Sequence, residues 1–71
     1  MTAKEGITYL ATKVPDEEPI FILRARDITA AHAVMHWAER AERNNVPEEK
    51  VCGAIKTAYE MKKWPAQRMP D

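Results

Sequence analysis

Residues 27–63 read DITAAHAVMHWAERAERNNVPEEKVCGAIKTAYEMKK, and this segment organises the rest of the chain. Apolar residues recur in it at the 3.6-residue spacing of an α-helix, on each side of the turn at residues 44–47. The pattern predicts one helix from an Asp27 N-cap to about Asn44 and a second from Pro47 to Lys63, packed as an antiparallel hairpin. The predicted core stripe comprises Ala30, Ala31, Val34, Met35, Trp37, Ala38 and Ala41 from the first helix and Val51, Ala54, Ile55, Ala58 and Met61 from the second.

The residues before Asp27 favour β-structure. Residues 7–13 (ITYLATK) and 20–26 (IFILRAR) are rich in β-branched and apolar side chains, and the proline-rich acidic segment 14–19 between them is typical of an exposed turn. The expected fold class is therefore α+β: an N-terminal β-hairpin followed by the two-helix hairpin, in the order ββαα. Residues 1–71 form one small domain in this interpretation, with loose termini at 1–6 and 66–71.

A homodimer is expected from this fold. A two-stranded sheet is weak by itself and leaves both of its edges unpaired. A chain of 71 residues also buries too little surface for a large core. Pairing with a second copy would cover a sheet edge and enlarge the core.

The composition excludes several classes of protein. With 45% hydrophobic and 31% charged residues, the chain is ordinary for a globular domain, and no apolar run approaches the roughly 18 residues of a membrane span. Eleven basic residues balance eleven acidic ones, so nucleic-acid and acidic-membrane partners are not expected. The single cysteine excludes an internal disulfide, and the start of the chain lacks a signal-peptide pattern, so a cytoplasmic protein is expected.

The segment 19–71 resembles a group of small phage and prophage proteins without an assigned function. The features that carry the resemblance are Phe21–Asp27 (FILRARD) leading into an alanine-rich helix with Trp37, the Trp64-Pro65 pair, and the final Arg68–Asp71 (RMPD). The resemblance implies a bacteriophage accessory protein that acts in the cytoplasm of a bacterial host. Proteins of this kind often block a host enzyme or a defence system.

One cluster of side chains suggests an anion site. Arg24 and Arg26 leave one face of the second predicted strand where the first helix begins, and Thr29 and His32 follow one helical turn apart. Arginine binds phosphate or carboxylate through two parallel hydrogen bonds, and a helix N-terminus attracts anions. Against this, the Asp27 carboxylate competes for the same amides, and the arginines can equally pair with Asp27 or Glu42 at a solvent-exposed strand end.

Metal binding and catalysis have weaker support. His32 and His36 lie four residues apart, a spacing that can hold a metal, but no His-Glu-x-x-His or Cys-x-x-Cys motif completes a site, and two surface histidines are the simpler interpretation. The chain contains no serine, and its acids form no convincing pair. We therefore expect neither an enzyme nor a bound metal or cofactor.

Two functions follow as hypotheses. The first is a non-catalytic phage protein that binds and inhibits or redirects a host protein, with Trp64 and Tyr9 as interface residues, because aromatic side chains dominate interface energetics. The second is an oligomer that sequesters a phosphate-bearing nucleotide through Arg24, Arg26 and His32.

Overall fold

The protein is helical. The computed structural model describes residues 1–69 and contains three helices: α1 (Ala3–Lys13), α2 (Ala30–Arg43) and α3 (Glu48–Lys62). No strand is present in the described part of the chain, where the only β-type pairing is an isolated parallel bridge between Asp27 and Arg68. The expected α+β fold with an N-terminal β-hairpin is therefore wrong, while the two predicted helices are confirmed.

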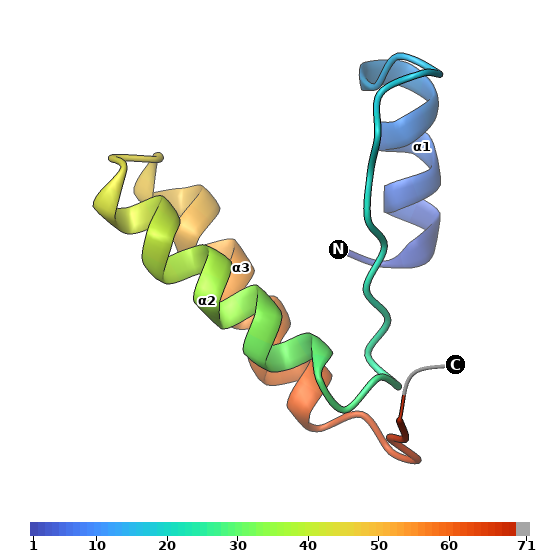
Figure 1. Ribbon diagram of the computed structural model, residues 1–71, viewed down its shortest axis with the longest axis vertical. Helices are drawn as coiled ribbons and strands as arrows, with labels where there is room; N and C mark the ends of the chain where they lie inside the picture. Colours follow the sequence, from blue (N-terminus) through green and yellow to red (C-terminus); the bar gives the residue numbers. More distant parts are fainter. Residues whose placement is uncertain (70–71) are drawn as a thin grey trace.

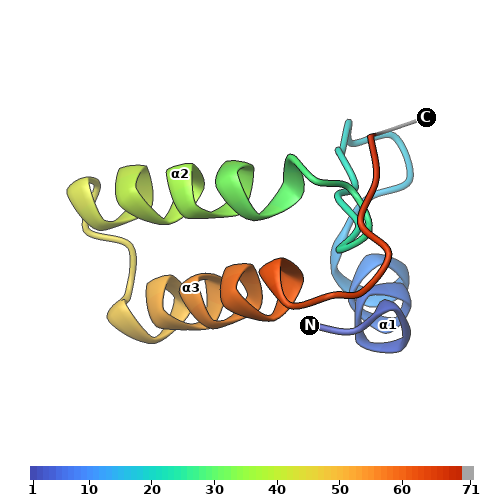
Figure 2. The same cartoon turned by 90° about the horizontal axis from the view of Figure 1, so that it is seen from below.

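Helices α2 and α3 form an antiparallel hairpin, and α1 lies beyond its open end (Figures 1 and 2). The hairpin core consists of small side chains, because alanines on facing helices allow the two backbones to approach closely. Its buried residues are Ala30, Ala31, Ala38 and Ala41 from α2 and Val51 and Ala58 from α3. Val46, Ala54 and Ile55 cover one end of this core.

Trp37 was predicted to be a core residue, and this is wrong: its side chain is 51% exposed. The contact line of α2 runs through Ala31, Ala38 and Ala41. Successive residues of a helix are rotated by about 100°, so Trp37 lies beside this line rather than on it. The narrow, alanine-lined interface leaves no room for an indole.

A residue in the left-handed backbone conformation ends α2. Asn45 has φ 60°, its N–H donates to the carbonyl of Glu42, and the N–H of Val46 donates to the carbonyl of Ala41. This is the Schellman arrangement, in which asparagine is one of the few residues that tolerate the required conformation. Val46 then packs against the hairpin core, which fixes the direction in which the chain enters α3.

Residues 7–13 form a helix, not the predicted strand, and residues 3–6 are its first turn rather than a loose end. A capping box starts α1: the Glu5 N–H donates to Thr2 Oγ1, and the Thr2 N–H donates to Glu5 Oε1. The hydroxyl groups of Thr8 and Thr12 donate to carbonyls one turn earlier, which accommodates these β-branched residues in a helix.

The second predicted strand, residues 20–26, is also absent. The chain turns at residues 15–18, where the Glu18 N–H donates to the Pro15 carbonyl, and then returns past α1 in the opposite direction as an extended segment (Figure 1). Within the described residues, no neighbouring strand pairs with it. With residues 7–13 in a helix, the partner strand that the hairpin required does not exist.

The C-terminal segment is tied to the residues that precede α2. The Arg68 N–H donates to the Arg26 carbonyl, the Ile28 N–H donates to the Arg68 carbonyl, and Gln67 Nε2 donates to the carbonyls of Ala25 and Met61. The expectation of a loose segment from residue 66 is thus incorrect for Gln67 and Arg68, and Pro70 and Asp71 lie outside the described residues. These bonds connect the residues just before α2 with the residues just after α3. We call this contact at the open end of the helical hairpin the junction.

Candidate functional site

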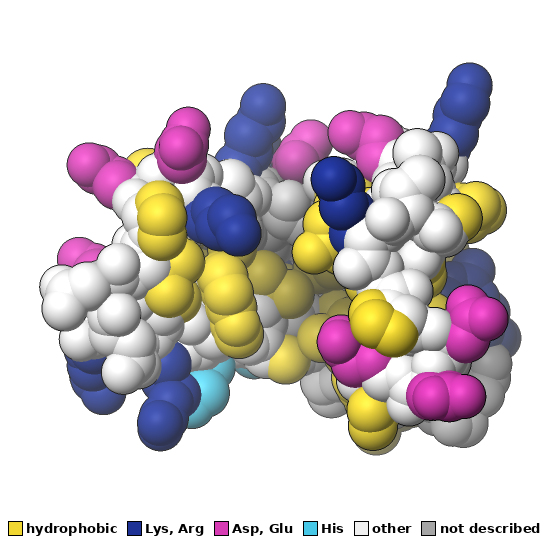
Figure 3. Space-filling model, turned by 90° about the horizontal axis from the view of Figure 1, so that it is seen from above, with side chains coloured by type: hydrophobic (Ala, Val, Ile, Leu, Met, Phe, Trp, Pro, Cys, Tyr) yellow, Lys and Arg dark blue, Asp and Glu magenta, His cyan; other side chains and the backbone are white. Residues whose placement is uncertain are grey.

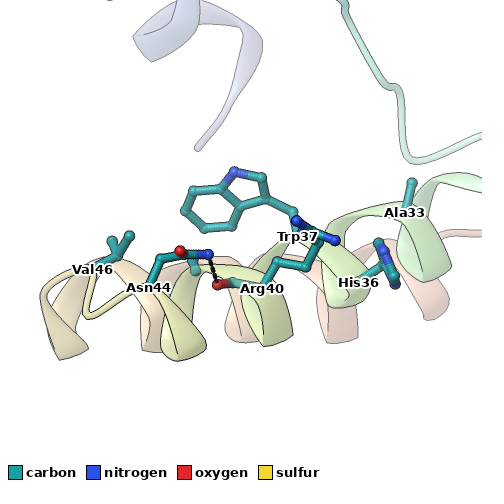
Figure 4. Close-up of a pocket in the computed structure, with 7 residues that line it drawn as sticks. Ala33, His36, Trp37, Arg40, Asn44 and Val46 are labelled. Carbon is teal, nitrogen blue, oxygen red and sulfur yellow. Dashed lines mark hydrogen bonds between the residues drawn. The ribbon is translucent and has the colours of Figure 1, made fainter.

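A hollow on the surface of α2 is the candidate site in the described part of the chain. It has a volume of about 410 Å³ and lies over Ala33, His36, Trp37, Arg40, Asn44 and Val46. Figure 4 shows the Trp37 indole projecting away from the ribbon of α2, with Arg40 and Asn44 along the same helix. The site exists because the narrow alanine core displaces the indole onto the flank of the hairpin.

The side chains of this hollow, which we call the Trp37 hollow, combine apolar surface with a cation. Asn44 Nδ2 donates to the Arg40 carbonyl at 2.7 Å, which fixes the amide at the end of α2. Within residues 1–69, no acidic side chain forms an ion pair with the Arg40 guanidinium. The hollow can therefore hold an apolar group of a partner while Arg40 binds a neighbouring carboxylate.

Most of the large apolar side chains lie on the surface of this protein, and no large side chain in the described part of the chain is fully buried. Figure 3 shows hydrophobic side chains on the flank of the helical hairpin that faces the N-terminal part of the chain. Tyr9 and Trp64, the predicted interface residues, are 52% and 56% exposed but do not line the Trp37 hollow. The remaining exposed residues of this kind are Met1, Ile7, Ile20, Phe21, Ile22, Ile28, Trp37, Tyr59 and Met69.

The predicted anion site at the start of α2 already contains an acid. Asp27 Oδ1 accepts hydrogen bonds from the Thr29 N–H at 2.7 Å and from the Thr29 hydroxyl at 2.6 Å. Asp27 therefore does not cap α2 directly, because the helix begins at Ala30 after Thr29. The two Thr29 donors that an incoming anion would need are engaged by this carboxylate, while Arg24 and His32 are exposed and Arg26 is half-buried. This geometry gives the nucleotide-binding alternative no specific support.

The contact between Asp27 and Thr29 predicts a measurable change in acidity. The side-chain and backbone hydrogen bonds from Thr29 lower the pKa of the Asp27 carboxyl below its usual value. Replacing Thr29 with alanine removes the hydroxyl donor, so we expect the pKa of Asp27 to rise toward its ordinary value in an NMR pH titration. In the parent protein, this contact stabilises the fold above the unfolded pKa and is lost as the pH falls through the folded pKa. An unchanged Asp27 pKa in the variant would contradict the assignment.

The histidines do not belong to a metal site in the described residues. His32 and His36 are both exposed, and no group of three or more His, Cys, Asp or Glu side chains lies close enough to hold a metal within residues 1–69. Cys52 is exposed on α3. No helix in this part of the chain is both long and apolar enough to cross a membrane.

The Trp37 hollow was not predicted from the sequence, although two of its residues were visible there. The sequence pattern places Trp37 in the core stripe, and Arg40 follows it by three residues on the same helix. Three positions apart on one helix, these two residues are neighbours at the edge of the apolar stripe. When alanines fill the apolar stripe of a helix, a tryptophan and an arginine at the edge of that stripe indicate a surface site.

Comparisons with protein-family models, with curated proteins and with solved structures find no match for this chain.

Proposed function

We propose that this chain is a non-enzymatic interaction protein that binds a partner protein through the Trp37 hollow and thereby inhibits or redirects it. The observation that carries the proposal is the half-exposed Trp37 beside an Arg40 that has no ion-pair partner in the described residues. Tryptophan and arginine are the side chains most enriched among residues that dominate binding energy at protein interfaces.

The hollow indicates the chemistry of the partner. An apolar side chain fits against the Trp37 indole and Val46, and an acidic side chain next to it pairs with Arg40. A partner segment with an aromatic or aliphatic residue near an aspartate or glutamate satisfies both contacts. The resemblance of residues 19–71 to small phage proteins makes a cytoplasmic host protein, such as a component of a defence system, the first class of partner to test.

The test compares two tryptophan variants. The tagged protein, Trp37→Ala and Trp64→Ala are used to capture proteins from a bacterial lysate, and a captured protein is then purified and its direct binding measured by calorimetry. Loss of a central interface tryptophan typically costs about 2 kcal/mol or more, so Trp37→Ala is expected to weaken binding by about thirtyfold. Trp64→Ala is the matched control, since Trp64 has the same side chain and a similar exposed fraction.

Circular dichroism of both variants separates loss of binding from loss of folding. Equal affinities of the parent protein and a folded Trp37→Ala variant would refute the proposal. A loss confined to Trp64→Ala would place the interface at the C-terminal end of α3 and would also overturn it.

A further inference from the structure

The segment Pro19–Leu23 (PIFIL) is unusual for an apolar part of a folded chain. Ile20, Phe21 and Ile22 are 51%, 86% and 70% exposed. No hydrogen bond within the described residues joins the backbone of residues 19–23 to another residue. An extended segment with unpaired backbone groups and apolar side chains can pair with another strand.

The charges on either side of this segment favour the same segment of a second copy as its pairing strand. Acidic residues precede it at positions 16–18, and arginines follow it at positions 24 and 26. A second copy that runs antiparallel brings the acidic end of one segment against the basic end of the other. The zero net charge of the chain also means that long-range repulsion does not oppose association of two copies.

A register centred on Phe21 satisfies both the charges and the apolar side chains. With Phe21 opposite Phe21 of the second copy, Ile20 lies opposite Ile22 and Glu18 lies opposite Arg24. Directly opposite side chains in an antiparallel pair share a face, so the two isoleucines and the ion pair contact across the strands. A slip of one residue places Glu18 opposite Ala25 and Glu17 opposite Arg26, and it replaces the symmetric Phe21–Phe21 pair with Phe21 opposite Ile22.

Pro19 fits the same register. Opposite residues in an antiparallel pair alternate between hydrogen-bonded and non-hydrogen-bonded pairs. If Ile20 and Ile22 form the bonded pairs, Phe21 and Pro19 fall in the non-bonded ones. Pro19, which has no N–H, then lies where no ladder donor is required.

We propose that residues 19–23 form a two-stranded antiparallel sheet with the same residues of a second copy of this chain, centred on Phe21 and flanked by Glu18 and Arg24. This self-pairing interface uses different residues from the Trp37 hollow, so it does not depend on the proposed function. A two-stranded sheet is weak by itself, and the dissociation constant is expected to be on the order of micromolar.

The first experiment measures mass by light scattering between about 1 μM and 1 mM, a range chosen to span a micromolar dissociation constant. The parent protein is expected to shift from the 8.1 kDa chain mass to twice that value as its concentration rises. Phe21→Asp, which changes a side chain that is 86% exposed, is expected to remain monomeric with unchanged helix content. A parent protein that stays monomeric throughout, or a Phe21→Asp variant that still dimerises, overturns the proposal.

The second experiment tests the register by cross-linking. In a Cys52→Ser background, Phe21→Cys is expected to form an intermolecular disulfide readily, because opposite Cα atoms of a non-bonded pair are about 4.5 Å apart and disulfides need about 4.4–6.8 Å. Ile20→Cys in the same background is expected to react more slowly, since residue 20 lies opposite residue 22. Ile7→Cys, 68% exposed on α1, measures random collision. A rate for Phe21→Cys no higher than for Ile7→Cys overturns the proposal.

The third experiment reverses one charge pair. Glu18→Arg places two arginines opposite each other at both ends of the sheet and is expected to weaken dimerisation by about fivefold or more, since like charges directly opposite are destabilising. Adding Arg24→Glu restores opposite charges and is expected to restore the dissociation constant. A double variant that is no better than Glu18→Arg alone would contradict the centre at Phe21.

Discussion

Replacing Ala38 with leucine is expected to remove a large part of the stability of the protein and to lower its unfolding midpoint markedly. Ala38 is 1% exposed and lies at the centre of the contact between α2 and α3. Three added carbon atoms would have to displace a facing helix whose own contact residues are small. Overpacking of this kind costs about 1–3 kcal/mol, and a domain of this size rarely gains more than about 3–5 kcal/mol from its core.

The measurement is urea or thermal unfolding followed by circular dichroism. Ala33→Leu is the matched control, since it makes the same change at an exposed position of the same helix. We expect the control to unfold within about 0.5 kcal/mol of the parent protein, as is usual for surface substitutions. Similar midpoints for the two variants would show that the hairpin interface is looser than the burial of Ala38 indicates.

Combining Gln67→Ala with Arg68→Pro is expected to release the N-terminal part of the chain from the helical hairpin. The pair of substitutions removes the Arg68 N–H that donates to Arg26 and the Gln67 amide that donates to Ala25 and Met61. Two of these bonds reach the N-terminal part, at Arg26 and Ala25, and each contributes about 0.5–1.5 kcal/mol net, so the open state should become at least about fivefold more populated. Trypsin cleavage after Arg24 and Arg26 should accelerate by the same factor.

The control for this prediction is Gln67→Ala combined with Arg68→Ala, which keeps the backbone N–H of residue 68. Because the Arg68 side chain is changed in both double variants, the difference between them measures the backbone bond to Arg26. We expect the proline variant to be cleaved faster, with the α2–α3 fragment surviving in both digests. Equal cleavage rates would show that the bridge between Asp27 and Arg68 does not hold the junction closed.

The helical hairpin could be predicted from the sequence because its signals are local and agree with one another. The alanine-rich period, the proline at the start of α3 and the asparagines after α2 all indicate the same boundaries. The start of the chain was misassigned because Ile7, Thr8 and Tyr9 favour strands by composition. The competing helical signal in the same residues is Thr2 and Glu5 at capping-box spacing, followed by Ile7, Leu10 and Val14 at helical spacing.

The candidate site could be predicted only in part. Tyr9 and Trp64 were predicted to be interface residues, and this stays a prediction; the position of Trp37 depends on which of two neighbouring lines of α2 faces α3. The period of a helix restricts the buried face to a broad stripe, and the close packing of alanines then selects one line within it. At the start of α2, the sequence placed Asp27 near Thr29, but only the structure shows that the Asp27 carboxylate accepts both Thr29 donors.

The hydrogen bonds between residues 25–28 and residues 67–68 have a consequence for the order of folding. Helices α2 and α3 contact each other across a short turn, so their pairing needs little chain closure and can form early. The bond from Gln67 to Ala25 spans 42 residues and requires the far end of the chain. During synthesis, α1 and the extended segment leave the ribosome first, yet their attachment to the hairpin waits until Arg68 has emerged. The junction is therefore expected to close after the helical hairpin has formed, and Ile20–Ile22 are exposed both before and after this step.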